Sequence, residues 1–197
     1  MIEVEKLEGM ADRLRVYDVD QNGWELDPEG KQRGRLRHNM AHVGLHLADV
    51  IERKDFFDTR IVRSEIAPDS MQYALRLARW GSVALEEIVP ASIDYSAAMS
   101  LQSRLRLNWI GSAPLASFIK AQGVLSRQLH SEDHVNTRKR AYDQRPEALG
   151  EVAGLLVQTA CMQANNDPNN EQFDIVEAFD LRLSHLRQRF GIPEPDA

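Results

Sequence analysis

The sequence lacks several features that would place it in a specialised class. Its 197 residues include one cysteine, Cys161, so no internal disulfide can form, and a single cysteine fits a reducing compartment. No stretch approaches the roughly 18 uninterrupted apolar residues of a membrane span. The N-terminus also lacks the basic region and apolar run of a secretory signal. We therefore expect a soluble, cytoplasmic protein with no membrane partner.

An excess of positive charge is also absent. The chain has 24 Lys and Arg against 30 Asp and Glu, which gives a formal net charge of −6. A generic DNA or RNA binder would be basic, so a nucleic-acid polymer is not an expected partner. Hydrophobic residues make up 43% and charged residues 27%, as in ordinary folded chains. The length suits one domain or two small ones.

Familiar catalytic motifs are missing too. The chain contains no glycine-rich phosphate loop, no Gly-x-Ser-x-Gly, no His-Glu-x-x-His and no Cys-x-x-Cys. Apolar residues instead recur every three or four positions, and this periodicity predicts an all-α protein. Proline is tolerated in a first turn, so one helix should begin near Pro68, and Gly191 with Pro193 should end the last. The expected helices are 3–17, 35–54, 60–80, 84–90, about 92–107, 114–130, 146–164 and 171–190.

Polar residues gather on one face of two neighbouring predicted helices. On 35–54 they are His38, His42, His46, Asp49 and Glu52, and on 60–80 they are Glu65, Asp69, Gln72 and Arg76. A short link predicts antiparallel helices whose polar faces meet. Facing carboxylates repel unless a cation lies between them, and a hard ion such as Mg²⁺ or Mn²⁺ suits oxygen ligands. A solvated face is the alternative, and the histidines alone leave a zinc site open.

A second polar segment matches the coarse formula of an EF-hand calcium loop. The match runs from Asp18 to Glu29, with Gly23 at the sixth position. Glu25 stands where an apolar residue is usual, and Pro28 interrupts the place where a helix should begin. A solvated turn is therefore the preferred interpretation, and calcium binding stays the alternative.

The second half of the chain echoes the first. Glu147 and Glu151 open the helix 146–164 four residues apart, as Glu65 and Asp69 do in 60–80. Each acidic pair follows an amphipathic helix and a polar loop, the second loop over 131–134. We expect a helical duplication, although amphipathic helices built from the same few residue types also resemble one another.

One stretch resembles the MazG-like nucleoside triphosphate pyrophosphohydrolases. Glu65-Ile66-Ala67-Pro68-Asp69 continues into Tyr73-Ala74-Leu75-Arg76-Leu77-Ala78, and Leu85-Glu86-Glu87 follows. In that all-α family a Glu-x-x-Asp pair opens such a helix, and a preceding helix carries Glu-Glu-x-x-Glu. The resemblance covers roughly residues 35–90 well and 114–191 loosely.

The resemblance implies a helical bundle and a reaction. The bundle would have an N-terminal helix and polar loop over 1–34, a MazG-like half over 35–110 and a degenerate half over 111–197. These halves would be four-helix-like and fused, and the family's assemblies also allow a homodimer. The reaction would be hydrolysis of a nucleoside triphosphate to monophosphate and pyrophosphate, with Mg²⁺ or Mn²⁺ as cofactor.

The resemblance also assigns residues to roles. His46, Asp49, Glu65 and Asp69 would hold the metal, and Glu52 would orient the attacking water. Arg76 or Lys54 would meet phosphate. Leu45 and His46 stand where the family has glutamates, and an apparently inserted Pro68 puts Glu65 four residues before Asp69 instead of three. These departures favour an alternative function, a catalytically lapsed MazG-like scaffold that binds a nucleotide or a protein partner.

Overall fold

The computed structural model describes residues 2–22, 32–52, 59–89, 112–165 and 172–193, and every regular element within these ranges is helical. This confirms the predicted all-α class, while the helix expected over 92–107 lies outside the described residues. Within these ranges, none of the helices has the length and apolar character needed to span a membrane. The elements are α1 (Val4–Asn22), α2 (Gln32–Glu52), α3 (Thr59–Ile61), the π-turn η1 (Val62–Ile66), α4 (Ala67–Gly81), α5 (Leu85–Ile88), α7 (Ser112–Asp133), α8 (Arg138–Asp143), α9 (Arg145–Asn165) and α10 (Ile175–Phe190).

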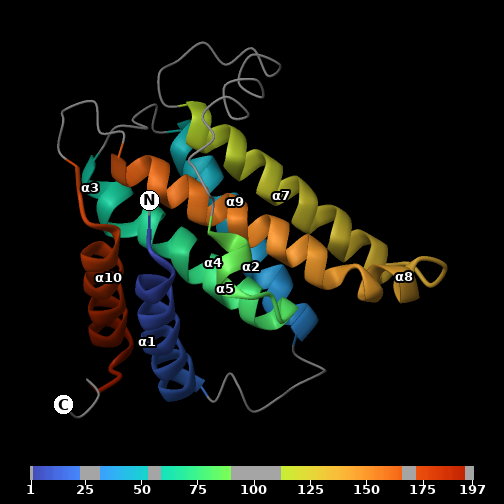
Figure 1. Ribbon diagram of the computed structural model, residues 1–197, viewed down its shortest axis with the longest axis horizontal. Helices are drawn as coiled ribbons and strands as arrows, with labels where there is room; N and C mark the ends of the chain where they lie inside the picture. The colour runs from blue at the N-terminus through green and yellow to red at the C-terminus, as the bar shows by residue number, and fades with distance from the viewer. Residues whose placement is uncertain (1, 23–31, 53–58, 90–111, 166–171, 194–197) are drawn as a thin grey trace.

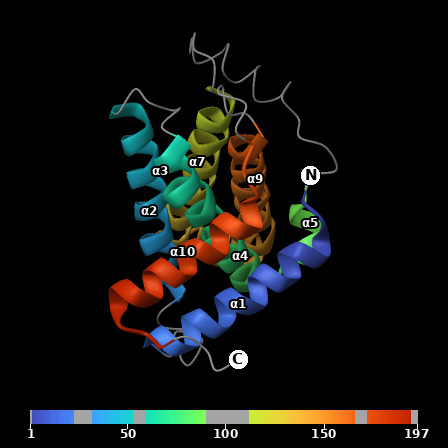
Figure 2. The same cartoon turned by 90° about the vertical axis from the view of Figure 1, so that its left-hand side faces the viewer.

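Long helices from the middle of the chain form a bundle, and two others cover one side of it. The bundle consists of α2, α4, α7 and α9, with its most extensive packing between α4 and α9 and between α7 and α9. Helices α1 and α10 lie next to each other and cross the bundle on the side of α4 (Figures 1 and 2). One continuous apolar core includes residues from all six helices. The predicted division into 1–34, 35–110 and 111–197 stays a prediction.

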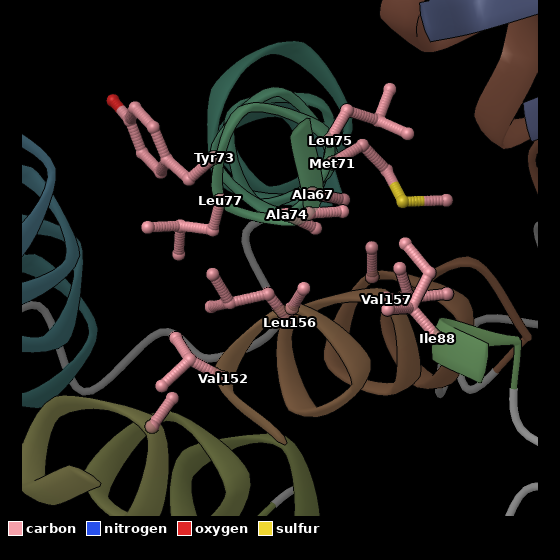
Figure 3. Packing of buried hydrophobic residues seen from close by; sticks show 14 of the residues in the cluster. Ala67, Met71, Tyr73, Ala74, Leu75, Leu77, Ile88, Val152, Leu156 and Val157 are labelled. Atoms are coloured by element: carbon pink, nitrogen blue, oxygen red, sulfur yellow. The ribbon is translucent and has the colours of Figure 1, made fainter. Parts of the chain in front are cut away.

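Helix α4 is enclosed by its neighbours. Every residue from Ile66 to Ala78 is buried, including the polar ones. Ala67 and Ala74 point toward Leu156 of α9, whereas Tyr73 points away from α9 toward α2 (Figure 3). The sequence predicts a helix with one apolar and one polar face, and both faces are covered here. The alternative of a solvated polar face is therefore wrong for most of this helix, and its buried polar groups must find partners in the protein.

Two glycines bring α4 and α9 together at one end. A Cβ added to Gly81 would lie 3.0 Å from Val83 Cγ2 and 3.1 Å from Leu149 Cβ. A Cβ added to Gly150 would lie 3.2 Å from Val83 Cγ1. A larger side chain at either position would therefore press on a packed neighbour, so glycine permits the close approach of the two helices.

A π-turn precedes α4. The amide of Ala67 donates to the carbonyl of Val62, five residues earlier, where an α-helix would use the fourth. Pro68 is in the first turn of α4, as the sequence predicts. Because α3, η1 and α4 follow one another without a break from Thr59 to Gly81, the helical segment as a whole begins earlier. A π-turn absorbs one extra residue in a helix, which is what the apparent insertion before Asp69 requires.

The helix ends follow local chemistry. Asp174 caps α10 because its Oδ1 accepts from the amide of Val176 at 2.8 Å. Gly191 ends α10 in a left-handed conformation with φ of 66°, which confirms the predicted stop. Ser82 ends α4 in the same region with φ of 53°, where a residue with a Cβ is strained.

The beginnings of two predicted loops are helical instead. Helix α1 continues through Asn22, past its expected end at residue 17, and Asp18 is only 1% exposed. The start of the 18–29 segment is thus neither a solvated turn nor a calcium loop, while its residues 23–29 lie outside the described ranges. Helix α7 likewise continues to Asp133, so the polar loop expected over 131–134 begins later.

Candidate functional site

The centre of the predicted site is the buried carboxylate of Asp69 in the first turn of α4. Its side chain is 7% exposed, and a guanidinium from α10 donates hydrogen bonds to both of its oxygens. Arg182 Nε donates to Oδ1 at 2.9 Å, and Arg182 Nη2 donates to Oδ2 at 2.8 Å. Gln72 Nε2 also donates to Oδ1 at 3.1 Å. Both oxygens therefore already have a charged partner, in the two-pronged geometry that arginine favours with carboxylates.

A histidine of α2 completes this cluster. His46 Nε2 lies 3.2 Å from Asp69 Oδ2, and both side chains are less than 10% exposed. Nε2 is not aligned for a hydrogen bond, and Nδ1 makes none either. Burial raises the pKa of Asp69, but the contacts with His46 and Arg182 outweigh it and hold that pKa below its ordinary value. The carboxylate is therefore ionised at neutral pH.

The other predicted ligands are placed differently. Glu65, on η1, is exposed and lines a surface cleft between η1 and α10. Asp49 and Glu52 belong to the last turns of α2, but their side chains lie outside the described part of the chain, as does Lys54. The structure thus brings His46 and Asp69 together, and it places Glu65 on the outer side. In the described ranges, no three His, Cys, Asp or Glu side chains come together as a metal site would require.

Arg76, expected as a phosphate contact, is engaged elsewhere. Its Nη2 donates to Asp18 Oδ1 at 2.6 Å, and its Nε donates to the same carboxylate. Arg79 Nη2 donates to Asp18 Oδ2 at 2.7 Å. The side chains of Asp18 and Arg76 are 1% and 9% exposed. This buried ion pair joins α1 to α4, so Arg76 has a structural role in this conformation.

The histidines of α2 form a row of tilted ring contacts beside Tyr73. The ring centroids of His38 and His42 are 4.4 Å apart, and those of His42 and Tyr73 are 5.7 Å apart. Burial, followed by the nearby His38 and His46, lowers the pKa of His42. Burial, followed by Arg76, lowers the pKa of His38. Both rings are thus kept neutral near neutral pH.

The echo in the second half differs from the first in its surroundings. Glu147 and Glu151 are exposed on α9 and line a cleft of about 720 Å³. Glu151 Oε1 is 2.8 Å from Lys120 Nζ, and both side chains are about half exposed. Buried Asp69 thus has no buried counterpart in this pair. The duplication stays a prediction.

Sequence reasoning missed the most important partner of the site. Arg182 lies 113 positions after Asp69, and no motif connects them. One signal was available, because a carboxylate buried in a helix with apolar neighbours needs a cationic partner from another element. The helix around Arg182 offers it on the side that packs against α4.

Comparisons with known proteins identify no relative. No protein-family model, no curated protein and no solved structure matches the chain. The geometry described above therefore carries the functional argument.

Proposed function

We propose that this protein is a MazG-like helical scaffold that binds a nucleotide without hydrolysing it. The observation that carries the proposal is the engagement of Asp69 by Arg182. A pyrophosphohydrolase of this kind needs the corresponding carboxylate for a divalent cation, and here a guanidinium occupies both of its oxygens. The positive charge required by the buried carboxylate is supplied from within the chain.

The donors at this position also differ from what Mg²⁺ prefers. Magnesium takes nearly ideal octahedral oxygen ligands and keeps several waters. The described donors are one carboxylate that accepts from Arg182 and Gln72, together with a histidine ring. Glu65 is exposed and lines the cleft beside α10. The described donor set therefore does not fit Mg²⁺ while Arg182 holds Asp69.

Two assays with the purified chain test this proposal. The first measures pyrophosphate release from a panel of canonical and damaged NTPs and dNTPs with Mg²⁺ or Mn²⁺, and we expect none. The second measures the melting temperature with a non-hydrolysable nucleoside triphosphate. A ligand at about 100 times its Kd stabilises by about 2.7 kcal/mol, which for a chain of this size raises Tm by about 5–10 °C. Absence of a Tm shift would refute nucleotide binding, and pyrophosphate release would refute the claim that the bound nucleotide is not hydrolysed.

Hydrolysis is the second candidate, and the ring of His46 favours it. Neither buried nitrogen of His46 makes a hydrogen bond, and Nε2 lies 3.2 Å from Asp69 Oδ2, so a metal ion bound through this one nitrogen would give the ring a partner. If this candidate is right, the first assay detects pyrophosphate, and His46→Gln abolishes its release. His130→Gln is the matched control, because His130 is an exposed histidine on α7. Pyrophosphate released equally by all three proteins would exclude a role for His46.

A further inference from the structure

A cleft on the surface of the cluster gathers arginines from two elements. It lies between the α3–η1 segment and α10 and has a volume of about 650 Å³. Arg60 and Arg63 line it on one side, and Arg182 and His185 line it on the other. This volume is in the range of small-molecule sites.

The charge in this cleft differs from that of the whole chain. The protein has a net charge of −6, and the cleft is lined by three guanidiniums and the carboxylate of Glu65. Asp69 neutralises one of these guanidiniums, that of Arg182. Arg63 Nη2 is 3.6 Å from Glu177 Oε2, and both side chains are about half exposed, so this ion pair is weak and easily exchanged. The exposed guanidiniums of Arg60 and Arg63 therefore supply the positive charge that an anion would meet in this cleft.

Arg182 contributes a donor that is held in position. Its side chain is 12% exposed, and its bonds to Asp69 use Nε and Nη2. The Nη1 amino group takes no part in these two bonds, and a guanidinium has five N–H donors in all. Asp69 thus acts as a positioning residue for a cleft arginine, which reduces the entropy lost when an anion binds.

The other lining groups narrow the class of anion. Ser64 adds a hydroxyl at the rim, while Ala178 and Leu181 form an apolar wall, with Leu181 59% exposed. Several guanidiniums on facing elements match a chain of phosphates better than a single carboxylate, because each phosphate offers oxygens to a separate arginine. An apolar wall next to them suits the flat face of a base.

We propose that the cleft between η1 and α10 binds the polyphosphate chain of a nucleotide, with Arg60, Arg63 and Arg182 as its contacts. That the bound polyphosphate belongs to a nucleotide rests on the proposed function, whereas binding of the phosphate chain itself does not. The polyphosphate site is tested separately, by titration with inorganic tripolyphosphate, which carries the same phosphate chain without a base or sugar.

The test is calorimetric titration of the whole chain with tripolyphosphate in metal-free buffer of fixed ionic strength. We expect one site per chain, and each arginine removed should weaken binding about tenfold. The double variant Arg60→Gln/Arg63→Gln changes two exposed side chains, so it should fold, and its affinity should fall about 100-fold. The matched control is Arg15→Gln/Arg189→Gln, which removes two exposed arginines that do not line the cleft.

Several outcomes would overturn the proposal. They are the absence of tripolyphosphate binding, an equal loss of affinity in the control variant, and orthophosphate binding as tightly as tripolyphosphate. A parallel titration with a non-hydrolysable nucleoside triphosphate separates the two proposals. If the wild type binds this nucleotide and the double cleft variant binds it equally well, the cleft assignment is wrong and nucleotide binding stands.

Discussion

The buried ion pair between α1 and α4 makes a sharp prediction about stability. In the variant Asp18→Ala, Arg76 loses the carboxylate that neutralises it and keeps its buried position at 8% exposure. Removing one partner of a buried ion pair typically costs about 3–5 kcal/mol, because the remaining charge stays desolvated. For a chain of about 200 residues this corresponds to a fall in Tm of roughly 6–20 °C.

The other arginine of the pair provides the control. The side chain of Arg79 is 31% exposed, so water screens its interaction with Asp18 and the variant Arg79→Ala should cost about 1 kcal/mol or less. The apolar double variant Asp18→Leu/Arg76→Met removes both buried charges of the closest pair. It should be more stable than Asp18→Ala, because apolar replacements of similar size fill the site without a desolvation cost.

Urea unfolding followed by far-UV circular dichroism measures all these variants. Equal midpoints for Asp18→Ala and Arg79→Ala would refute the reasoning, because only Asp18→Ala removes the carboxylate that neutralises a buried guanidinium, whereas Arg79→Ala leaves Asp18 paired with Arg76. A calcium titration of the wild type provides an independent check. Asp18 accepts from both Arg76 and Arg79, so calcium should not bind at the start of the 18–29 segment.

Three further predictions concern local geometry and pH. Ser82→Gly should stabilise by about 1 kcal/mol in thermal unfolding, because φ of 53° strains a residue with a Cβ; an unchanged Tm would contradict that strain. Gly150→Ala should destabilise by about 1–3 kcal/mol through its contact with Val83, whereas Gly123→Ala, at an ordinary 3.5 Å from the flexible end of Arg127, should not. The lowered pKa of His42 means that the unfolded chain binds protons more readily, so stability is full above about pH 6.5 and falls as the pH drops below it. Urea midpoints across this range should fall less for His42→Gln than for the wild type, and equal slopes would exclude His42 as the source.

Local patterns in the sequence predicted the helices well and their surroundings poorly. Apolar periodicity is a property of one segment, so the all-α class and the stop at Gly191 could be read directly. Which faces are covered depends on distant segments. The sequence predicted Asp18 in a solvated turn and Asp69 as a metal ligand, yet each is buried against an arginine from another helix. Periodicity carries no information about such long-range partners.

The candidate site shows the same division. Helical spacing and antiparallel packing predicted that His46 and Asp69 would meet, and their side chains lie 3.2 Å apart. The same reasoning placed Glu65 beside them, but the π-turn changes the register of this segment relative to α4, and Glu65 faces the α10 cleft. A π-turn contains one extra residue compared with an α-helical turn. A single sequence does not show which residue is extra unless a related sequence gives the normal spacing between the residues on either side.

The enclosure of α4 has a consequence for how the chain is made. A ribosome synthesises α4 long before it reaches Arg182, which lies 113 positions after Asp69. A nascent chain that stops before α10 therefore contains α4 without the guanidinium that neutralises its carboxylate. Helix α9, which packs most extensively against α4, is complete before α10 is made, but the charge of Asp69 is neutralised only once Arg182 is present. The last helix of the chain therefore completes the electrostatic environment of α4.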